Sequence, residues 1–324
     1  MILAGTGYYL PAKRLTNQDL IKLIDTTDEW IVTRTGIRER RVVSDGETTA
    51  SMAVAAARDA LAQANIKATD LDAIILATVT PDVRLPATSC LVQAELGAGH
   101  CAAFDIVAAC SGFVYGTVLV DRLIRGGQYR NVLLIGSESL SRITDYTDRG
   151  SCILFGDGAG AAVFSRCDDA SRGVLYHKLA ADGTGWEFIH IPAGGTRQPA
   201  SEQTLKDRQH FMKMRGRDVY KFAVTRMQDL IRDAMEKCNL TAEQVKLIIP
   251  HQVNQRIIDS AVEKLNFPPD KVYVNIDRFG NTSAASVPIA LHEARLRGQV
   301  SPGDTIILVA FGAGLTWASA VIKL

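Results

Sequence analysis

The stretch FDIVAACSGFVYG, residues 104–116, passes from an apolar strand pattern through a run of small residues into a helical pattern. The spacing of its apolar residues predicts a strand at 103–107 and a helix at 112–126. Cys110 lies at the junction between the two. Because short apolar strands of this kind are typical of sheets covered by helices on both faces, the junction predicts an α/β fold.

The same alternation of strand and helix continues on both sides of this junction. Further strands are predicted at 71–78, 132–135, 245–249, 272–276 and 305–310. Further helices are predicted at 51–64, 85–96, 219–237, 254–265 and 283–296. The strands near 71 and 132 match those near 245 and 306 at an offset of about 174 positions, which is typical of a duplicated domain.

We therefore predict two similar halves, residues 1–170 and 171–324. The first half carries the cysteine of the opening junction. The second half begins with a stretch, residues 171–215, that is rich in glycine, proline and charge, and we expect it to be a loop-rich surface excursion.

The composition excludes several classes of protein. Its 36 Lys and Arg residues nearly balance 35 Asp and Glu residues, so no overall charge favours nucleic acid or an anionic membrane. The apolar runs are far shorter than the roughly 20 residues that cross a bilayer, and the start MILAGTGYYLP lacks a signal-peptide pattern. We expect a cytoplasmic protein. Six irregularly spaced cysteines predict neither a metal site nor a disulfide framework.

Three segments carry residues that are suited to chemistry. Cys110 is predicted at a helix start, where free N–H groups and the helix dipole favour the nucleophilic thiolate, although this segment alone would favour a structural core cysteine in a tight turn. His251 follows a predicted strand at the sheet edge where ligands of α/β proteins bind, and otherwise would be a capping group. Asn281 lies near the position equivalent to Cys110, and by itself would be a helix N-cap.

The segment FGAGLTW, residues 311–317, predicts a glycine-rich turn near the C-terminus. Its backbone N–H groups, together with the N–H of Cys110, would stabilise the oxyanion of an acyl-transfer intermediate. As a structural feature alone it would be another tight connection between strands. Other glycine-rich stretches lack the lysine of a phosphate loop and the dinucleotide fingerprint, so we assign them to turns.

Taken together, AACSGFVYG, PHQVNQRI, FGNTSAAS and FGAGLTWASA resemble the 3-oxoacyl-acyl carrier protein synthases of the third, initiating class, in the thiolase superfamily. The resemblance covers nearly the whole chain. It includes TDEWIVTRTGIRER at 27–40, TDRGS at 147–151, LFGDGAGAAV at 154–163 and GRDVYKFAV at 216–224.

This resemblance implies a five-layered αβαβα fold of the thiolase type, a homodimer, and a catalytic triad at Cys110, His251 and Asn281. It implies an acyltransferase that initiates fatty acid biosynthesis. Acetyl-CoA or another acyl-CoA primer would acylate the cysteine, and malonyl-acyl carrier protein would decarboxylate and condense to a 3-oxoacyl-acyl carrier protein. Coenzyme A is then part of a substrate, and no metal or other cofactor is expected.

The resemblance also assigns binding residues. The coenzyme A contacts would be Trp30, Arg34, Arg149 and Asn254. The second oxyanion donor would be Ala313, and Leu85, before Pro86, matches a residue that caps the primer pocket of the partner subunit. Because this position is often aromatic in the family, leucine here leaves the primer length open.

Chemically, decarboxylation of a malonyl thioester leaves an enolate, which two neutral donors at His251 and Asn281 would stabilise. The carrier protein of this family is acidic and requires a local basic cluster for docking. We expect this cluster at Arg256 and Lys264, unless these residues simply form a solvated helix face.

Two alternative functions remain. A related synthase of specialised metabolism would use a longer or branched primer, and a non-catalytic acyl-binding subunit would lack a triad residue, whereas all three are present.

Overall fold

The computed structural model describes residues 1–324 and contains two sheets that lie one above the other. The first sheet has the order β1 (Ile2–Tyr9), β7 (Gly158–Ser165), β6 (Asn131–Glu138), β4 (Ala73–Ala77) and β5 (Ala102–Ile106). The second has the order β8 (Gly173–Ala181), β13 (Thr316–Lys323), β12 (Thr305–Gly312) and β11 (Leu247–Pro250). The two orders are equivalent strand for strand, except that the second sheet lacks a counterpart of β5.

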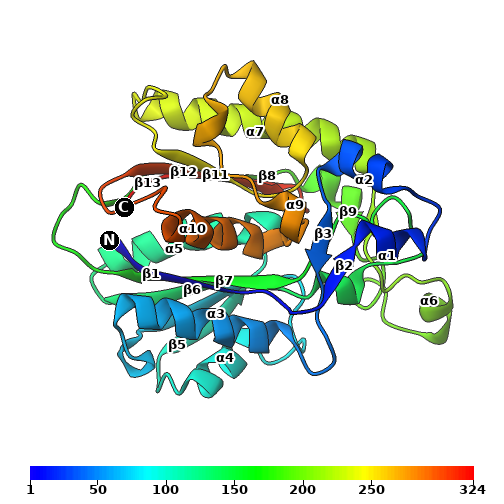
Figure 1. Cartoon of the computed structure of the whole chain (residues 1–324). Coiled ribbons are helices and arrows are strands. Elements are labelled where there is room, and N and C mark those ends of the chain that lie inside the picture. Colours follow the sequence, from blue (N-terminus) through cyan, green and yellow to red (C-terminus); the bar gives the residue numbers. More distant parts are fainter.

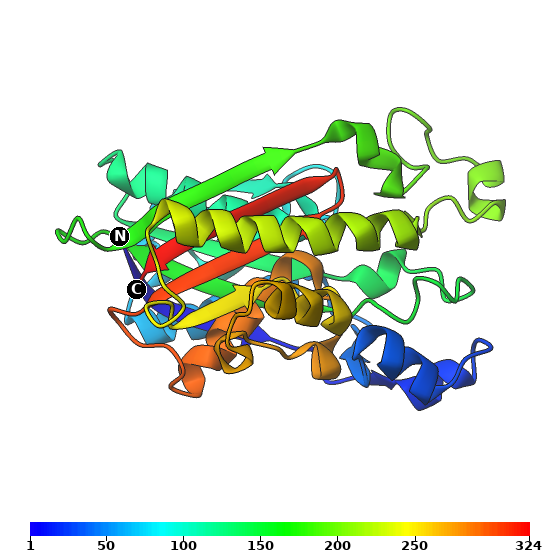
Figure 2. The same ribbon diagram turned by 90° about the horizontal axis from the view of Figure 1, so that it is seen from above.

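Helices fill the three remaining layers (Figure 1). The central layer, between the sheets, consists of α5 (Gly112–Arg125) and α10 (Ser286–Leu296). The outer layers consist of α3 (Thr49–Ala64) and α4 (Thr88–Leu96) on the first sheet, and α7 (Gly216–Lys237) and α8 (Gln255–Lys264) on the second. Seen from above, α7 runs lengthwise over the strands of the second sheet (Figure 2). The predicted five-layered αβαβα arrangement is confirmed.

The core explains why the strands are so apolar. Every residue of β4 and of β12 is buried, because each strand has helices on both faces. The largest apolar cluster joins both sheets through the central helices, where α10 is buried from Ser286 to Ala294. A helix enclosed on all sides in this way is apolar around most of its circumference.

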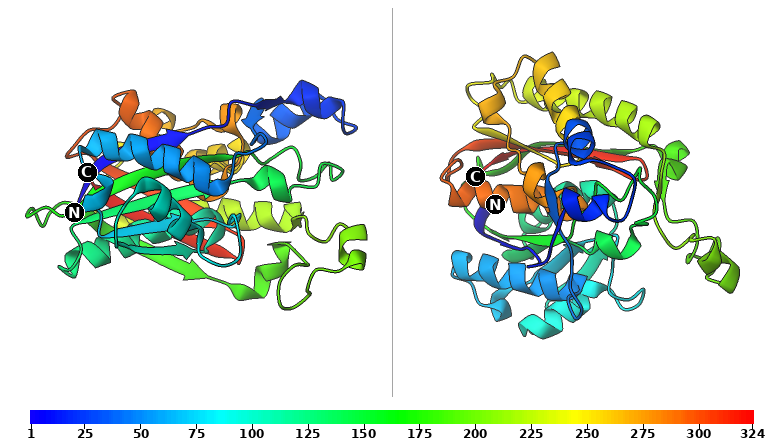
Figure 3. Two further views of the ribbon diagram at one scale, coloured as in Figure 1. Left: turned by 90° about the horizontal axis from the view of Figure 1, so that it is seen from below. Right: turned by 45° about the vertical axis from the view of Figure 1, so that its right-hand side comes forward.

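The remaining elements lie at one end of the layers, away from both termini (Figure 1). They are β2 (Arg14–Thr16), α1 (Asn17–Ile21), α2 (Asp28–Thr35), β3 (Glu39–Arg41), β9 (Ile189–His190), α6 (Glu202–Lys206), β10 (Lys213–Met214) and α9 (Ile276–Phe279). The segment with α6 projects outward from the layers (Figure 3). No helix combines the length and the apolar character that crossing a membrane requires.

Two sequence predictions need correction. The strand predicted at 272–276 is reduced to a single bridge between Val272 and Ile248, and α9 already begins at Ile276. The side chain of Gln252 accounts for this, because it donates to Tyr273 O and accepts from Asn275 N, which replaces a strand ladder.

The predicted excursion at 171–215 is also partly wrong. Its first part, Gly173–Ala181, is the edge strand β8, which pairs with β13 along its whole length. Only the part from Asp182 onward leaves the sheet. The charged and polar residues of the whole stretch concealed a strand whose edge position exposes many of its side chains to water.

Candidate active site

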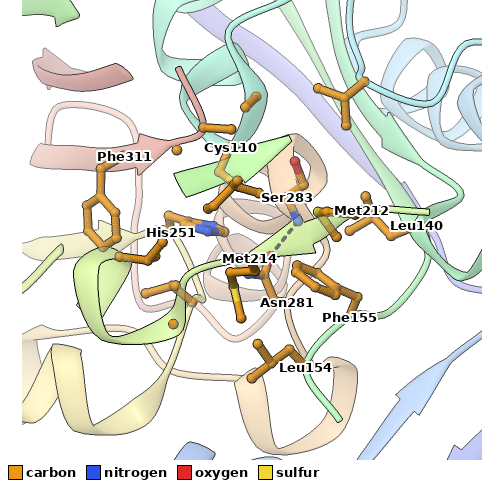
Figure 4. A pocket seen from close by; sticks show the side chains of 18 of the residues that line it. Cys110, Leu140, Leu154, Phe155, Met212, Met214, His251, Asn281, Ser283 and Phe311 are labelled. Carbon is orange, nitrogen blue, oxygen red and sulfur yellow. Dashed lines mark hydrogen bonds between the residues drawn. The ribbon is translucent and has the colours of Figure 1, made fainter. Parts of the chain in front are cut away.

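A cavity of about 330 Å³ opens at the carboxyl ends of the parallel strands, between the two halves of the chain. Most of the residues that line it are apolar. The cavity brings together Cys110, His251 and Asn281, which the sequence placed on three separate segments (Figure 4). Asn254 and Ala313 line it as well.

Cys110 lies in a short 3₁₀ turn, η2 (Ala109–Ser111), between β5 and α5. Ala109 adopts a φ of 46°, which bends the chain sharply and turns the next residue toward the cavity. The turn is held by Thr316, whose hydroxyl donates to Ala108 O at 3.0 Å. The turn η2 also passes close to Gly312: a Cβ at Gly312 would lie 2.7 Å from Cys110 N.

The electrostatic setting of Cys110 differs from the sequence-based expectation. Burial raises the pKa of its thiol to about 12, and the nearby charge of Glu138 raises it further, while a hydrogen bond from Ser283 acts in the opposite direction. The N–H group of Cys110 itself lowers the pKa, as expected at a helix start, but burial outweighs this contribution in the resting site. The sulfur is held as a thiol and needs a base before it can attack.

His251 follows β11 and is completely buried. Its Nδ1 lies 2.7 Å from Ser286 Oγ, and that oxygen also accepts the N–H of Gln252 at 3.4 Å. The serine hydroxyl is free to donate to Nδ1, and on this basis we assign the imidazole proton to Nε2. Nε2 has no hydrogen-bond partner in the protein. Burial lowers the pKa of His251 to about 3, so the ring is neutral.

Asn281 is fixed by its neighbours on both sides. Its backbone N–H donates to Leu154 O at 2.9 Å, and its carbonyl accepts from Gly156 N at 3.0 Å. Its side-chain Oδ1 accepts from Ser283 N at 2.9 Å, the bond that is drawn in Figure 4. Because the oxygen is already occupied, the amide NH₂ group is left for the cavity.

Sequence reasoning missed three residues behind this arrangement. Ser286 orients the ring of His251, Ser283 orients the amide of Asn281, and Glu138 accepts a hydrogen bond from Ser283 Oγ at 3.0 Å. Glu138 is the last residue of β6, a strand predicted correctly near this position. An acidic residue at the carboxyl end of a buried parallel strand is a signal that could have identified it.

The residues expected to contact coenzyme A also come together. Two guanidinium groups lie over the ring of Trp30, with the Arg149 carbon 4.3 Å and the Arg34 carbon 4.8 Å from the ring centre. Asn254 Nδ2 donates to Arg34 O at 2.9 Å, which links this cluster to the cavity wall. The cluster thus marks a continuous surface from Trp30 to the cavity.

The other predicted positions lie further out. Leu85 is 88% exposed and does not line the cavity of its own chain. Arg256 and Lys264 are exposed on α8, and Arg256 stacks on Tyr220, a residue of the cavity wall, at 5.7 Å from the ring centre.

Two equivalent sheets around a central helix layer, with a cysteine, a histidine and an asparagine facing one cavity, define a condensing enzyme of the thiolase-like class. Models of one family match both parts of the chain. The model described as 3-oxoacyl-[acyl-carrier-protein] synthase III matches residues 104–183. The model described as the C-terminal part of the same synthase matches residues 235–324.

Individual proteins agree with these models. The chain is 53% identical over 319 residues to the β-ketoacyl-[acyl-carrier-protein] synthase III of Caldanaerobacter subterraneus, covering 98% of this chain and 96% of that protein. The crystal structure of 3-oxoacyl-[acyl-carrier-protein] synthase III from Aquifex aeolicus has 48% identity and a TM-score of 0.91, with 99% of each chain covered. The Thermus thermophilus synthase structure has 42% identity and a TM-score of 0.92, covering 100% of this chain and 99% of that one.

The chain therefore belongs to the β-ketoacyl-[acyl-carrier-protein] synthase III family. The predicted activity, an acyltransferase that acts as the initiating condensing enzyme of fatty acid synthesis, is confirmed over its alternatives.

Proposed function

We propose that the chain joins an acyl-CoA primer, acetyl-CoA first of all, to malonyl-acyl carrier protein on the side chains of Cys110, His251 and Asn281. The observation that carries this proposal is the unpaired Nε2 of a completely buried histidine, beside an asparagine amide whose oxygen is already occupied. Buried polar groups normally have partners, so two donors left for one cavity indicate a ligand oxygen between them.

In the first half-reaction the sulfur of Cys110 attacks the primer thioester and the coenzyme A thiol leaves. The backbone N–H groups of Cys110 and Ala313 would stabilise the negative charge on the thioester oxygen. The close crossing of Gly312 over Cys110 N supports this assignment, because it brings the turn at Ala313 against the nucleophile.

In the second half-reaction malonyl-acyl carrier protein loses carbon dioxide, and its enolate attacks the acyl group on Cys110. His251 Nε2–H and the Asn281 amide would donate to the enolate oxygen. A histidine with a pKa of about 3 suits this role, because it stays neutral and keeps its proton as a donor.

For the substrates, we assign the coenzyme A contacts to Trp30, Arg34, Arg149 and Asn254, supported by the stacked cluster at the cavity entrance. A planar adenine ring and phosphates suit an aromatic ring flanked by guanidinium groups. We assign carrier-protein docking to Arg256 and Lys264, because α8 contributes Ile257 to the cavity wall and Arg256 stacks on another wall residue.

We also propose a homodimer that pairs through the edge of the first sheet. The edge strand β5 is only partly buried along its length. Close to it, Val107 is 78% exposed and Leu85 is 88% exposed. Exposed apolar side chains beside an open strand edge are typical of a self-association surface. Leu85 would then reach the partner's primer pocket.

Two further assignments follow the sequence. We propose that the halves 1–170 and 171–324 are the two units of a duplicated domain, since β7 ends at Ser165 and β8 begins at Gly173. We propose a cytoplasmic location, since all six cysteines are free, as they are in a reducing compartment.

The test is intact-mass measurement after incubation with acetyl-CoA. We expect one acetyl group per chain in the wild type and none in Cys110→Ala, with Cys90→Ala as the matched control that is acetylated normally. Acetylation that persists in Cys110→Ala would refute the assignment of the nucleophile. Repeating the measurement with longer and branched acyl-CoAs would define which primers fit the apolar cavity.

A further inference from the structure

Glu138 is a buried carboxyl group that none of the steps above uses. It is the last residue of β6, its side chain is completely buried, and it does not line the cavity. No lysine, arginine or histidine pairs with it. Burying a carboxylate without a cation is unfavourable unless hydrogen bonds compensate, so the groups around Glu138 show what the site favours.

Those hydrogen bonds divide unequally between the two oxygens. Oε2 accepts from Thr80 Oγ1 at 2.7 Å, from Val79 N at 3.1 Å and from Thr78 Oγ1 at 3.2 Å. Oε1 accepts from Ser283 Oγ at 3.0 Å, with a longer contact of 3.3 Å from Val79 N. Oε2 therefore accepts hydrogen bonds from three donors, whereas the closest donor to Oε1 is a single hydroxyl group, which can rotate.

Ser283 connects this carboxyl group to the nucleophile. Its φ of 49° places it in the left-handed region, where a non-glycine residue persists only if its surroundings hold it. Its hydroxyl donates to Oε1 at 3.0 Å, and Ser283 lines the same cavity as Cys110, where it lowers the pKa of the thiol (Figure 4). Cys110, Ser283 and Glu138 therefore form a chain of three groups that can pass a proton.

The proposed mechanism needs such a chain, because the resting sulfur carries a proton that must leave when it attacks the primer. His251 does not accept this proton in the arrangement described above: Nε2 already carries a hydrogen, and Nδ1 is occupied by Ser286. In the series that runs from Cys110 through Ser283, Glu138 is the group that can act as a base.

We propose that Glu138 takes up the Cys110 proton through the hydroxyl of Ser283 during acylation, an inference that rests on the proposed function. As the bond between sulfur and the acyl carbon forms, the S–H proton moves to Ser283 Oγ and the hydroxyl proton of Ser283 moves to Glu138 Oε1. When the bond to coenzyme A breaks, the same chain in reverse delivers the proton to the departing sulfur. Glu138 ends the half-reaction ionised, as it began.

The titration behaviour of the site supports this role. Burial raises the pKa of Glu138 to about 7, whereas hydrogen bonds from Thr80, Val79, Ser283 and Thr78 lower it. A base whose pKa lies near neutrality is well matched to accept and return a proton. The groups bonded to Glu138 are hydroxyl and backbone N–H groups, and its charge raises the pKa of the Cys110 thiol. Since the acceptor must be ionised, the acylation rate should fall as the pH drops below about 7.

The experiment measures both half-reactions separately in Ser283→Ala and Glu138→Gln. Acetylation of Cys110 is followed by intact mass over time, and decarboxylation by carbon dioxide release from malonyl-acyl carrier protein. We expect acetylation to slow by about 100-fold in each variant, within the usual range for a lost general base. Decarboxylation should persist in Ser283→Ala, because Asn281 is oriented by the backbone N–H of residue 283, which the substitution keeps.

The pH profile gives a second readout that a purely structural role would not change. The inflection near pH 7 in wild-type acetylation should disappear in Glu138→Gln and return, shifted, in Glu138→Asp. Asp157→Asn is the matched control: Asp157 is equally buried, burial raises its pKa too, and it bonds to Ser141 and Val43 rather than toward Cys110. This control should acetylate at the wild-type rate.

Wild-type acetylation rates in both Ser283→Ala and Glu138→Gln would overturn the proposal, and so would equal losses in the two half-reactions. If Glu138→Gln fails to fold, Ser283→Ala decides the question alone. Failure of the broader proposed function would look different, since the wild type itself would then not be acetylated at Cys110.

Discussion

In the first half the chain leaves β5 through Ala108, enters the turn η2 and continues into α5. In the second half it passes from Asn281 through Thr282 into the turn η6 (Ser283–Ala285) and then α10. The two turns share their backbone conformation: φ is 46° at Ala109 and 49° at Ser283, which are 174 positions apart. At the same offset Cys110 corresponds to Ala284. The duplicated backbone is thus retained while the nucleophile is present in one copy only.

This difference assigns separate tasks to the two copies. The first turn carries the sulfur and its own N–H group, which belong to acyl transfer. The second turn carries Asn281 before it, Ser283 within it and Ser286 after it, which orient the two donors for the enolate. If this division is correct, loss of His251 or Asn281 should affect decarboxylation far more than acylation, whereas the hydroxyl of Ser283 is the one group of the second copy that serves acylation.

The largest effect is expected for His251→Ala and for Asn281→Ala. Each removes one donor to the enolate, so decarboxylation should slow by about 100- to 1,000-fold. Acetylation of Cys110 should remain near normal. Because the pKa of His251 is about 3, its ring stays neutral, and wild-type decarboxylation should be independent of pH between 5 and 8. Carbon dioxide release across this range, beside acetylation by intact mass, measures both expectations.

Equal losses in the two half-reactions would contradict the division between the turns. A decarboxylation rate that rises or falls through pH 6.5 would show that His251 titrates in the working range, and that it acts as a base rather than a neutral donor.

A smaller effect is expected where each turn crosses a glycine of the other half. A Cβ at Gly312 would lie 2.7 Å from Cys110 N, and a Cβ at Gly136 would lie 2.3 Å from Ala284 O. Since backbone must move in both cases, Gly312→Ala and Gly136→Ala should each lower the free energy of unfolding by about 1–3 kcal/mol. Chemical denaturation measures this loss.

The two alanine variants should also separate by activity. Gly312→Ala displaces Cys110 and should impair acetylation alone, whereas Gly136→Ala displaces the second turn, which orients Asn281 and carries Ser283, and should impair decarboxylation as well. Gly183→Ala, where a Cβ meets nothing within 4 Å, is the control that changes neither. The same activity profile in both glycine variants would count against separate tasks.

The comparison also shows how far sequence could lead. Cys110, His251 and Asn281 were singled out because each lies at a predicted turn, and the family resemblance of the segments around them identified the three as a triad. Glu138 was missed because its partners Thr78 and Ser283 are 60 and 145 positions away, so no local pattern records the hydrogen bonds.

The wrong strand at 272–276 has a related cause. Its alternation is typical of a strand, but Gln252, more than twenty positions earlier, supplies side-chain bonds that replace the ladder. The pKa of Cys110 could not be predicted for the same reason. Burial by residues from both halves, rather than the local helix start, decides whether the sulfur is a thiol.

The smallest effect concerns the outer helices, which differ in charge between the halves. α8 carries Arg256 and Lys264, whereas its counterpart α4 carries no basic residue. An acidic carrier protein should therefore dock beside α8, although Glu263 next to Lys264 weakens the cluster. Arg256→Glu should raise the KM for malonyl-acyl carrier protein by about fivefold at low salt.

The effect should shrink as salt screens the charges, and acetyl transfer from acetyl-CoA should be unchanged because that step needs no carrier protein. Steady-state kinetics at two ionic strengths measures both. Arg58→Glu, on α3 of the first half and also exposed, is the matched control: it makes the same charge change beside α4 and should leave KM as it is. An unchanged KM in Arg256→Glu would place docking elsewhere. An equal rise of KM in both variants would show that the change in the protein's net charge, rather than a docking contact at α8, causes the effect.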